Sequence, residues 1–273
     1  MAWLPSKKRI WSASFADTVN NTLFTIHHHG YVILDRQWRE AIEVRDSNRL
    51  YIVKSGSGTV LIDGTTVRLF GGHAYLFPVN RKISFSCDDI LEKFFIHFSL
   101  SLHGLFDIFE LYEPNGYARA VDPSVFGVID RFSTENLKES LAVHDVLRPI
   151  ITSFIGPERS DIPMKITLAQ KYRPLLSHID ANLSIALSLN DLADIMNLTP
   201  AYLSSSFKRD TGKTLKRVII GHIVRRAERE LVSTDRKIRD IAGELGFADE
   251  FYFSKFFKRE TGIPPTVYRQ QHT

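Results

Sequence analysis

Residues 202–212 read YLSSSFKRDTG, and residues 252–262 read YFSKFFKRETG. The two stretches lie 50 positions apart, and the run Phe-Lys-Arg-acid-Thr-Gly stands in register in both. A short apolar segment precedes each, Asp191-Leu192-Ala193 in the first and Asp240-Ile241-Ala242 in the second. A helix, a tight turn and a second helix with a basic end form the pattern of a helix-turn-helix DNA reader. A duplication of this length indicates a repeated architecture.

Local signals predict where the helices of this region begin and end. One helix is predicted over 165–182, Ser188 is the expected N-cap of the next, and Thr199 with Pro200 begins the first reading helix. The helix over 239–245 lacks a serine cap, and the second reading helix begins at Asp249 or Glu250. Gly262 is expected to end it, and Pro264-Pro265 to block further helix, leaving a short closing turn.

Residues 215–232 predict a long connecting helix of about 27 Å at ~1.5 Å per residue. Two readers on one face of a duplex must lie roughly 34 Å apart, one turn of DNA. The connecting helix is therefore compatible with a rigid spacer between the two units.

The residues of the two reading helices divide by face. Leu203 and Phe207, like Phe253 and Phe257, stand at i and i+4 and are expected in the core. The open faces are expected to meet base edges in the major groove, and they carry Ala201, Ser204, Ser205, Glu250, Phe251, Ser254 and Lys255. The basic ends are expected to meet phosphates, and they carry Lys208, Arg209, Lys258 and Arg259. For each single residue the alternative is a solvated helix face.

Charge is unevenly distributed along the 273 residues. The segment 166–273 holds 17 Lys and Arg against 12 Asp and Glu, whereas the rest holds 18 against 19. The whole positive excess lies in the segment with the repeats, which favours a polyanionic partner for that part alone. A binder that only bends DNA fits poorly, because such proteins depend on wedges and broad basic surfaces.

The first 120 residues predict short strands. Strands are expected over 50–54, 59–62, 65–70, 74–77, 83–86 and 94–98, with turns at 55–58, at Asp63-Gly64 and after Ser86. Such spacing favours a small barrel or sandwich. Leu137, Leu141, Val146 and Ile150 then fall at helical spacing, with Pro149 expected to kink or interrupt the helix, and 155–163 is expected as a linker.

Residues 241–269, IAGELGFADEFYFSKFFKRETGIPPTVYR, resemble the DNA-binding domain of the AraC/XylS family of transcription regulators. The resemblance implies two helix-turn-helix units that read adjacent major grooves. By position, the family's base-contacting residues fall at Ala201, Ser204, Ser205, Glu250, Phe251 and Lys255. Ser205 departs from the family, in which a longer basic side chain is frequent, so the first unit is expected to read more weakly.

The β region, with 51–58, 69–78 and 95–99, is similar to the cupin-like sensor domain of many such regulators. This implies an α+β chain: a cupin-like β-barrel over 1–122, a helical dimerisation segment and linker over 123–164, and an all-α DNA-binding domain over 165–273. The resemblance implies as partners double-stranded operator DNA, a small effector such as a sugar, a second copy of the chain, and RNA polymerase if the protein activates.

Within the expected barrel, strand alternation puts Lys93, Phe95 and His97 on one face. If that face is the interior, they join Lys54 and Arg81 as candidate effector-binding residues.

The triplet His27-His28-His29 raises the alternative of a cupin-type metal enzyme fused to a DNA-binding domain. Only His27 and His29 would share a strand face, and a catalytic metal usually takes three protein ligands. The stretch after Pro78, where metal cupins supply a further histidine, has none, so ordinary polar strand residues are favoured and no metal or cofactor is expected.

The single cysteine, Cys87, excludes an internal disulfide and suits a reducing cytoplasm. No secretion signal or membrane-spanning stretch is expected from the sequence.

Overall fold

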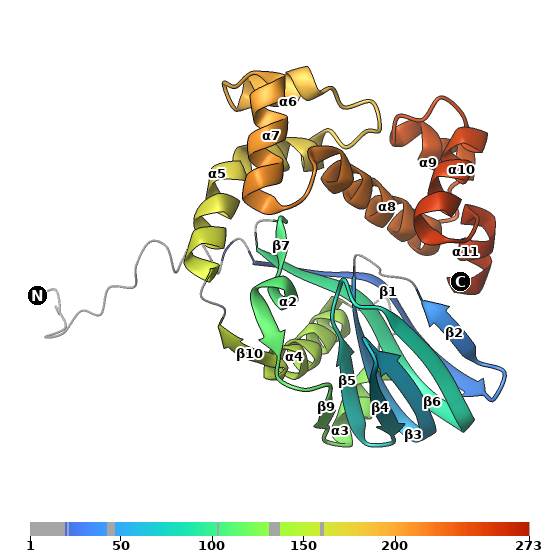
Figure 1. The fold of residues 1–273 in the computed structure, drawn as a ribbon. Coiled ribbons are helices and arrows are strands. Elements are labelled where there is room, and N and C mark those ends of the chain that lie inside the picture. The colour runs from blue at the N-terminus through green and yellow to red at the C-terminus, as the bar shows by residue number, and fades with distance from the viewer. Residues whose placement is uncertain are drawn as a thin grey trace, which may run out of the picture.

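The computed structural model describes residue 20 and residues 22–42, 47–102, 104–130, 137–158 and 161–272. Its first half is an antiparallel sheet in the order β1-β6-β3-β5-β9, with β2 and β7 also paired to β6 and β4 to β3 (Figure 1). The strands are β1 (Thr22–Asp35), β2 (Arg39–Ile42), β3 (Asn48–Ile62), β4 (Thr65–Phe70), β5 (His73–Phe77), β6 (Ile83–Leu102), β7 (Phe106–Asp107) and β9 (Ala118–Ala120).

The sheet does not close, so the prediction of a β-barrel is wrong in this respect. The long strands β3 and β6 change partners along their length: β6 pairs with β2 near its start and with β1 over its second half. In the same way β3 pairs first with β5 and then with β4. The path ends at β1 and β9, which do not pair with each other within the described residues. The result is a curled open sheet.

Two predicted turns are instead continuous strand. The glycine-rich stretch 55–58 lies inside β3, with one register shift just before Ser55 and another between Gly56 and Gly58. Gly56 has φ +83°, and a Cβ there would lie 1.9 Å from the carbonyl oxygen of Ile90. These glycines thus allow a bulge and a close strand approach. Likewise β6 runs through the acidic residues after Ser86. The Asp63-Gly64 hairpin is confirmed, with φ +46° and +84°.

Apolar layers cover both faces of the sheet. One face packs against α3 (Ser124–Ile129) and α4 (Leu137–Ser153) through side chains such as Val143, Leu147 and Ile151. The other face holds a separate cluster that includes Tyr51, Phe77 and Phe85. Helix α4 continues through Pro149. The expected linker contains β10 (Ile155–Glu158), which pairs with β8 (Tyr112–Pro114) just after α2 (Ile108–Leu111).

The second half is helical, as predicted. Its elements are α5 (Ile162–Ala181), α6 (Leu189–Ile195), α7 (Pro200–Thr211), α8 (Leu215–Ser233), α9 (Ile238–Glu244), α10 (Glu250–Thr261) and α11 (Pro265–His272). The expected closing turn is wrong: α11 is a helix that begins at Pro265, since proline is tolerated at the first helical position. Within the described residues, no helix is both long and apolar enough to cross a membrane.

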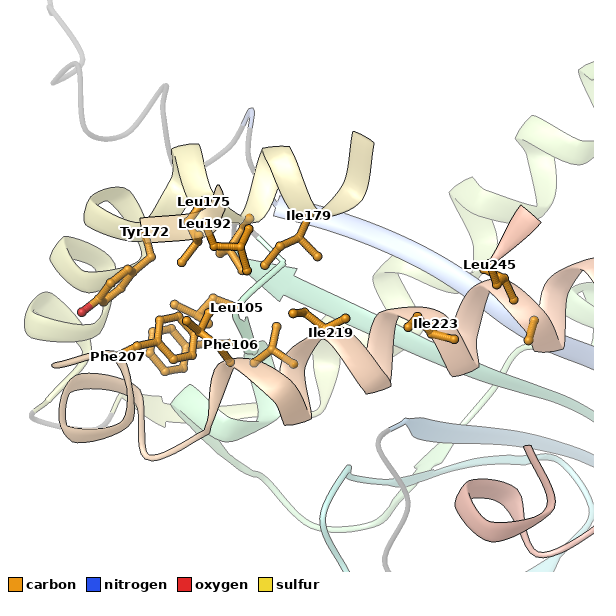
Figure 2. Packing of buried hydrophobic residues seen from close by; sticks show 14 of the residues in the cluster. Leu105, Phe106, Tyr172, Leu175, Ile179, Leu192, Phe207, Ile219, Ile223 and Leu245 are labelled. Carbon is orange, nitrogen blue, oxygen red and sulfur yellow. The ribbon is translucent and has the colours of Figure 1, made fainter. Parts of the chain in front are cut away.

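The two halves share buried apolar packing. Leu105, just before β7, and Phe106, in β7, lie in one cluster with Tyr172 of α5, Phe207 of α7 and Ile219 of α8 (Figure 2). All five side chains are at most 9% exposed. The helical half is therefore docked on the sheet. The boundaries predicted at 122 and 164 stay predictions.

Candidate nucleic-acid interface and interdomain cavity

The two reading helices, α7 and α10, are capped in the same way at both ends. The hydroxyl of Thr199 accepts a hydrogen bond from the backbone N–H of Tyr202 at 3.3 Å. The carboxylate of Asp249 accepts one from Tyr252 at 2.7 Å. Each helix ends at a left-handed glycine. The expected caps at Thr199 and Gly262 and the expected start of the second reading helix are confirmed, and they fix where each reading face begins.

The predicted core stripe is confirmed: Leu203, Phe207, Phe253 and Phe257 are fully buried. Corresponding positions 206 and 256 are buried as well. The buried Ser206 hydroxyl has a hydrogen-bond partner, because it donates to the carbonyl of Leu203 at 3.2 Å. The faces opposite these buried residues are thereby left to solvent and to DNA.

Most of the side chains predicted to meet bases are exposed. Ala201, Ser204, Ser205, Phe251 and Lys255 lie in solvent, with Phe251 74% exposed, whereas Glu250 and Ser254 are half-buried. The Ser205 hydroxyl donates to the carbonyl of Tyr202 at 3.1 Å, so this side chain folds back on its own helix.

The sequence interpretation omitted Tyr202 and Tyr252, each 53% exposed at the same repeat position. Their signal was present: an aromatic ring recurs just before the core residue in both copies. Their hydroxyls and rings add contact area to both faces.

The basic ends of the two reading helices are also built alike. Lys208 and Lys258 are exposed. Arg209 pairs with Asp210 at 3.2 Å, and Arg259 pairs with Glu260 at 2.8 Å.

The acidic partners of these arginines also bond to neighbouring helices. Asp210 accepts hydrogen bonds from Lys171 Nζ at 2.7 Å and from the Tyr172 hydroxyl at 2.8 Å. The bond from Lys171 holds the pKa of Asp210 below its usual value. Glu260 pairs with Arg217 of α8 at 2.8 Å. Each acid thus ties its reading helix to a neighbouring one.

The candidate effector residues do not form one cluster. Lys93, Phe95 and His97 share a sheet face, but Lys93 is only 3% exposed, and its Nζ lies 3.4 Å from the ring centroid of Tyr51 and 4.1 Å from that of Trp38. That part of the face is filled by protein.

The other two candidates lie at the surface. Lys54 pairs with Glu92 at 3.2 Å, and Arg81 pairs with Asp63 at 3.0 Å and with Glu113 at 3.4 Å. Hydrogen bonds from Tyr31, Ser55 and Lys54 lower the pKa of Glu92 to about 2.

The same sheet face opens further along into a cavity of about 970 Å³ between the two halves. The sheet wall consists of Leu23, Thr25, His27, Ser99 and Ser101. The opposite wall is α8, with Arg217, Val218, Gly221, His222, Arg225, Arg226 and Arg229. The remaining lining includes residues 180–184 after α5 and Glu244 with Leu245 at the end of α9. The size lies near the upper end of ordinary ligand pockets.

His27 lies at one corner of this cavity. Its Nε2 is 3.1 Å from the Ser99 hydroxyl. Burial, with Arg225 and Arg229 close by, lowers its pKa to about 3. The expectation that His27 and His29 share a face is wrong, because the pairing of β1 with β6 shifts register at this point. His27 and His28 are buried and His29 is exposed.

The four carboxylates that line the cavity all have partners. Asp107 accepts hydrogen bonds from Asn48 and two backbone N–H groups, and burial raises its pKa to about 7. Glu110 pairs with Lys213 at 2.9 Å. Asp180 lies 2.5 Å from His222, and Glu244 pairs with Arg226 at 3.0 Å. No group of three metal-ligating side chains occurs in the described part of the chain.

Comparison with known proteins agrees with this arrangement. A family model described as a helix-turn-helix domain matches residues 192–271. The chain is 24% identical to the Msm operon regulatory protein of Streptococcus mutans over 93% of this chain and 95% of that protein. It is 33% identical to the HTH-type transcriptional activator AarP of Providencia stuartii, over 36% of this chain and 73% of AarP.

The whole fold is shared with a solved structure. ToxT from Vibrio cholerae, bound to (E)-4-(8-methylnaphthalen-1-yl)but-3-enoic acid, superposes with a TM-score of 0.58 at 13% identity, covering 92% of this chain and 99% of ToxT. The chain is a regulator rather than an enzyme, and it belongs to the AraC/XylS family of transcription regulators.

Proposed function

We propose that this protein is a sequence-specific DNA-binding regulator whose operator affinity is set by a small-molecule effector, a sugar or related metabolite. The observation that carries the proposal is the matched pair of reading helices, capped alike by Thr199 and Asp249 and joined by one long helix. Because both copies keep the same caps, core stripe and basic end, we expect both units to contact DNA.

The spacing of the two units favours one continuous operator. Helix α8 has 19 residues, which at ~1.5 Å per residue is about 28 Å. This length is compatible with two reading faces that lie one turn of DNA, roughly 34 Å, apart. The operator is therefore expected to contain two short elements on one face of the duplex.

Two further partners follow from the same architecture. The likeness to ToxT, solved with a small carboxylic acid bound, supports a small-molecule effector. Leu141 of α4 is 57% exposed on the helix predicted to pair two protomers, which supports a homodimer. We place the protein in the cytoplasm, with RNA polymerase as a partner if it activates transcription.

The test begins with selection of genomic fragments by the full-length protein, followed by affinity measurements on the enriched site and on random DNA. Lys255→Ala should weaken binding to the site by about ten- to a hundredfold and to random DNA far less, because a base contact discriminates. Lys258→Ala should weaken both alike and reduce the salt dependence, because a phosphate contact carries no sequence information.

Two outcomes would count against the proposal. Enrichment of no motif, with non-specific binding intact, would remove the sequence-specific function. Equal losses in Lys255→Ala and Lys258→Ala on both kinds of DNA would remove the assignment of Lys255 as a base-contacting residue.

A further inference from the structure

We propose that the cavity between the sheet and α8 binds a small anionic, hydroxylated metabolite, a sugar phosphate or a sugar acid, and that this ligand acts on both reading units at once. The inference rests on the proposed function, because it names the site and the chemical class of its effector. It moves the effector from the filled face around Lys93 to the open end of the same face.

Charge in the cavity favours an anion. Five cationic side chains line it, Lys213, Arg217, Arg225, Arg226 and Arg229, against four carboxylates. Each carboxylate already has a partner on the protein, and three of the cations, Lys213, Arg217 and Arg226, are themselves paired with Glu110, Glu260 and Glu244. Arg229 makes no ion pair with any residue that the structure describes, and it lies with Arg225 close to His27. A neutral histidine does not balance the Arg229 guanidinium, so this corner suits a phosphate or carboxylate.

The polar groups around that corner favour a hydroxylated ligand. Thr25, Ser99 and Ser101 form a row of hydroxyls along the sheet wall, and Asn182 and Ser184 face the cavity from beyond α5. Hydroxyls both donate and accept, which matches the alternating groups of a polyol. None of the described residues that line the cavity is Phe, Tyr or Trp, so no large aromatic ring is available for a neutral sugar to stack on. The anionic group is then the main anchor.

The position of the cavity explains how a ligand would reach the DNA-binding faces. Residues 180–184 lead into the first unit, and Glu244 with Leu245 ends α9 in the second. The units touch there: the N–H of Ile185 donates to the carbonyl of Leu245 at 2.9 Å. A Cβ on Gly246 would lie 2.0 Å from the Ser184 hydroxyl. A ligand against this junction gains differential affinity for whichever arrangement of the two units it fits.

Calorimetric titration of the full-length protein tests the chemical class. The probes are glucose 6-phosphate and gluconate, with glucose, inorganic phosphate and palmitate as comparisons. We expect measurable binding of glucose 6-phosphate or gluconate, at least tenfold tighter than glucose or phosphate alone. The probe that binds distinguishes phosphate from carboxylate. Binding of glucose alone, of palmitate alone, or of none of the probes would overturn the proposal.

Variants test the site. Arg229→Ala and Arg225→Ala should each weaken the bound probe about tenfold or more, the usual effect of removing one charge-assisted contact. The matched control is Arg239→Ala, which removes the same charge from an exposed side chain on α9 and should leave the affinity unchanged. Unchanged probe affinity in both cavity variants, with the melting temperature preserved, would place the ligand elsewhere.

Operator binding separates this inference from the proposed function. Enrichment of a motif without any effect of the probes leaves the regulator intact and removes the cavity proposal. Probe binding without sequence-specific DNA binding would support the cavity as a ligand site and would remove the proposed regulatory function. The full proposal requires that the bound probe change operator affinity and that Arg229→Ala reduce this change.

Discussion

The two reading units share their internal construction and differ in their open faces and in how each is tied to the sheet. Both have an apolar stripe at i and i+4, an oxygen N-cap, a left-handed glycine at the end and an acid that anchors the helix from behind. The first presents alanine and serines, whereas the second presents Glu250, Phe251 and Lys255. The second unit therefore carries most of the chemistry that can discriminate bases.

The ties to the sheet differ in the same way. The first unit meets it through an apolar contact, in which Leu105 and Phe106 lie beside Phe207 (Figure 2), and through the Glu110–Lys213 ion pair. Toward the second unit a polar contact is present, because Arg225 and Arg229 of α8 lie near His27. The ring centroids of Tyr268 in α11 and His28 also lie 6.5 Å apart. We infer that the first unit makes the apolar contact that holds the helical half on the sheet, whereas the second carries most of the base discrimination.

The largest expected effect comes from removing the apolar contact of Leu105 and Phe106 with the first unit, which we call the apolar tie. Phe106→Ala removes a side chain that is 4% exposed from the shared cluster. Loss of a buried phenylalanine costs about 3–5 kcal/mol in the free energy of unfolding. Chemical denaturation measures this loss, and DNA affinity with and without an effector measures the coupling between the halves. Both should fall.

The matched control is Phe98→Ala, because Phe98 is fully buried on the far face of the sheet against α4. It should lose similar stability but retain the effect of the effector on DNA binding. If both variants lose that effect equally, the tie through Phe106 has no special role.

The next effect is the pH dependence of the free energy of unfolding. It compares His27, at the polar contact with α8, and Asp107, at the apolar tie. His27, at the polar tie, has its folded pKa lowered to about 3 from 6.5, so the unfolded chain takes up the proton first and stability is lost as pH falls through 6.5. Asp107, next to Phe106, has its folded pKa raised to about 7 from 3.8, so its contribution is largest at low pH and is lost as pH rises through 7.

These two contributions nearly cancel each other between pH 5 and 7. On going from pH 7 to pH 5, Asp107→Asn should lose on the order of 2 kcal/mol of unfolding free energy and His27→Gln should gain about as much. Denaturation at several pH values measures the slopes. The control is His178→Gln on α5, which also removes one histidine. Parallel slopes in the two variants would contradict the assignment.

Local sequence signals predicted the helical half well because its determinants are local. Caps at Ser188, Thr199 and Asp249 and the stop at Gly262 act within one helical turn of the residues that encode them. The closing helix α11 was missed because Pro264-Pro265 was taken as a block, although a proline can also begin a helix.

The sheet and the cavity depend on partners distant in sequence. Gly56 reads as a turn residue, but its role is set by the backbone of Ile90, and sheet closure depends on which strands meet at β1 and β9. Strand alternation did put Lys93, Phe95 and His97 on one face. It could not show that Trp38 and Tyr51 fill that face, or that α8 covers its open end, since both follow from tertiary packing.

A smaller effect tests the inequality of the reading faces directly. Phe251→Ala, which removes an exposed ring, should weaken binding to the selected site by about 1–2 kcal/mol relative to random DNA, because an apolar base contact is lost. Ser204→Ala at an exposed position of the first helix should change the same difference by less than about 0.5 kcal/mol. Quantitative footprinting on the two half-elements resolves the effects. A larger loss from Ser204→Ala would reverse the comparison.

The smallest effect concerns the helices that precede the reading helices. Ser188 caps α6 by accepting from the N–H of Asn190 at 3.1 Å, whereas Lys237 at the start of α9 makes no side-chain cap, although its backbone is extended as a cap requires. Ser188→Ala should cost about 1 kcal/mol of unfolding free energy, and Lys237→Ser should recover up to a similar amount in the second unit. Thermal denaturation checks both, with Lys237→Ala separating loss of the charge from gain of the cap. If Lys237→Ser gives no more stability than Lys237→Ala, the second unit is limited by something other than its missing cap, and the difference between the units then lies in their faces and ties alone.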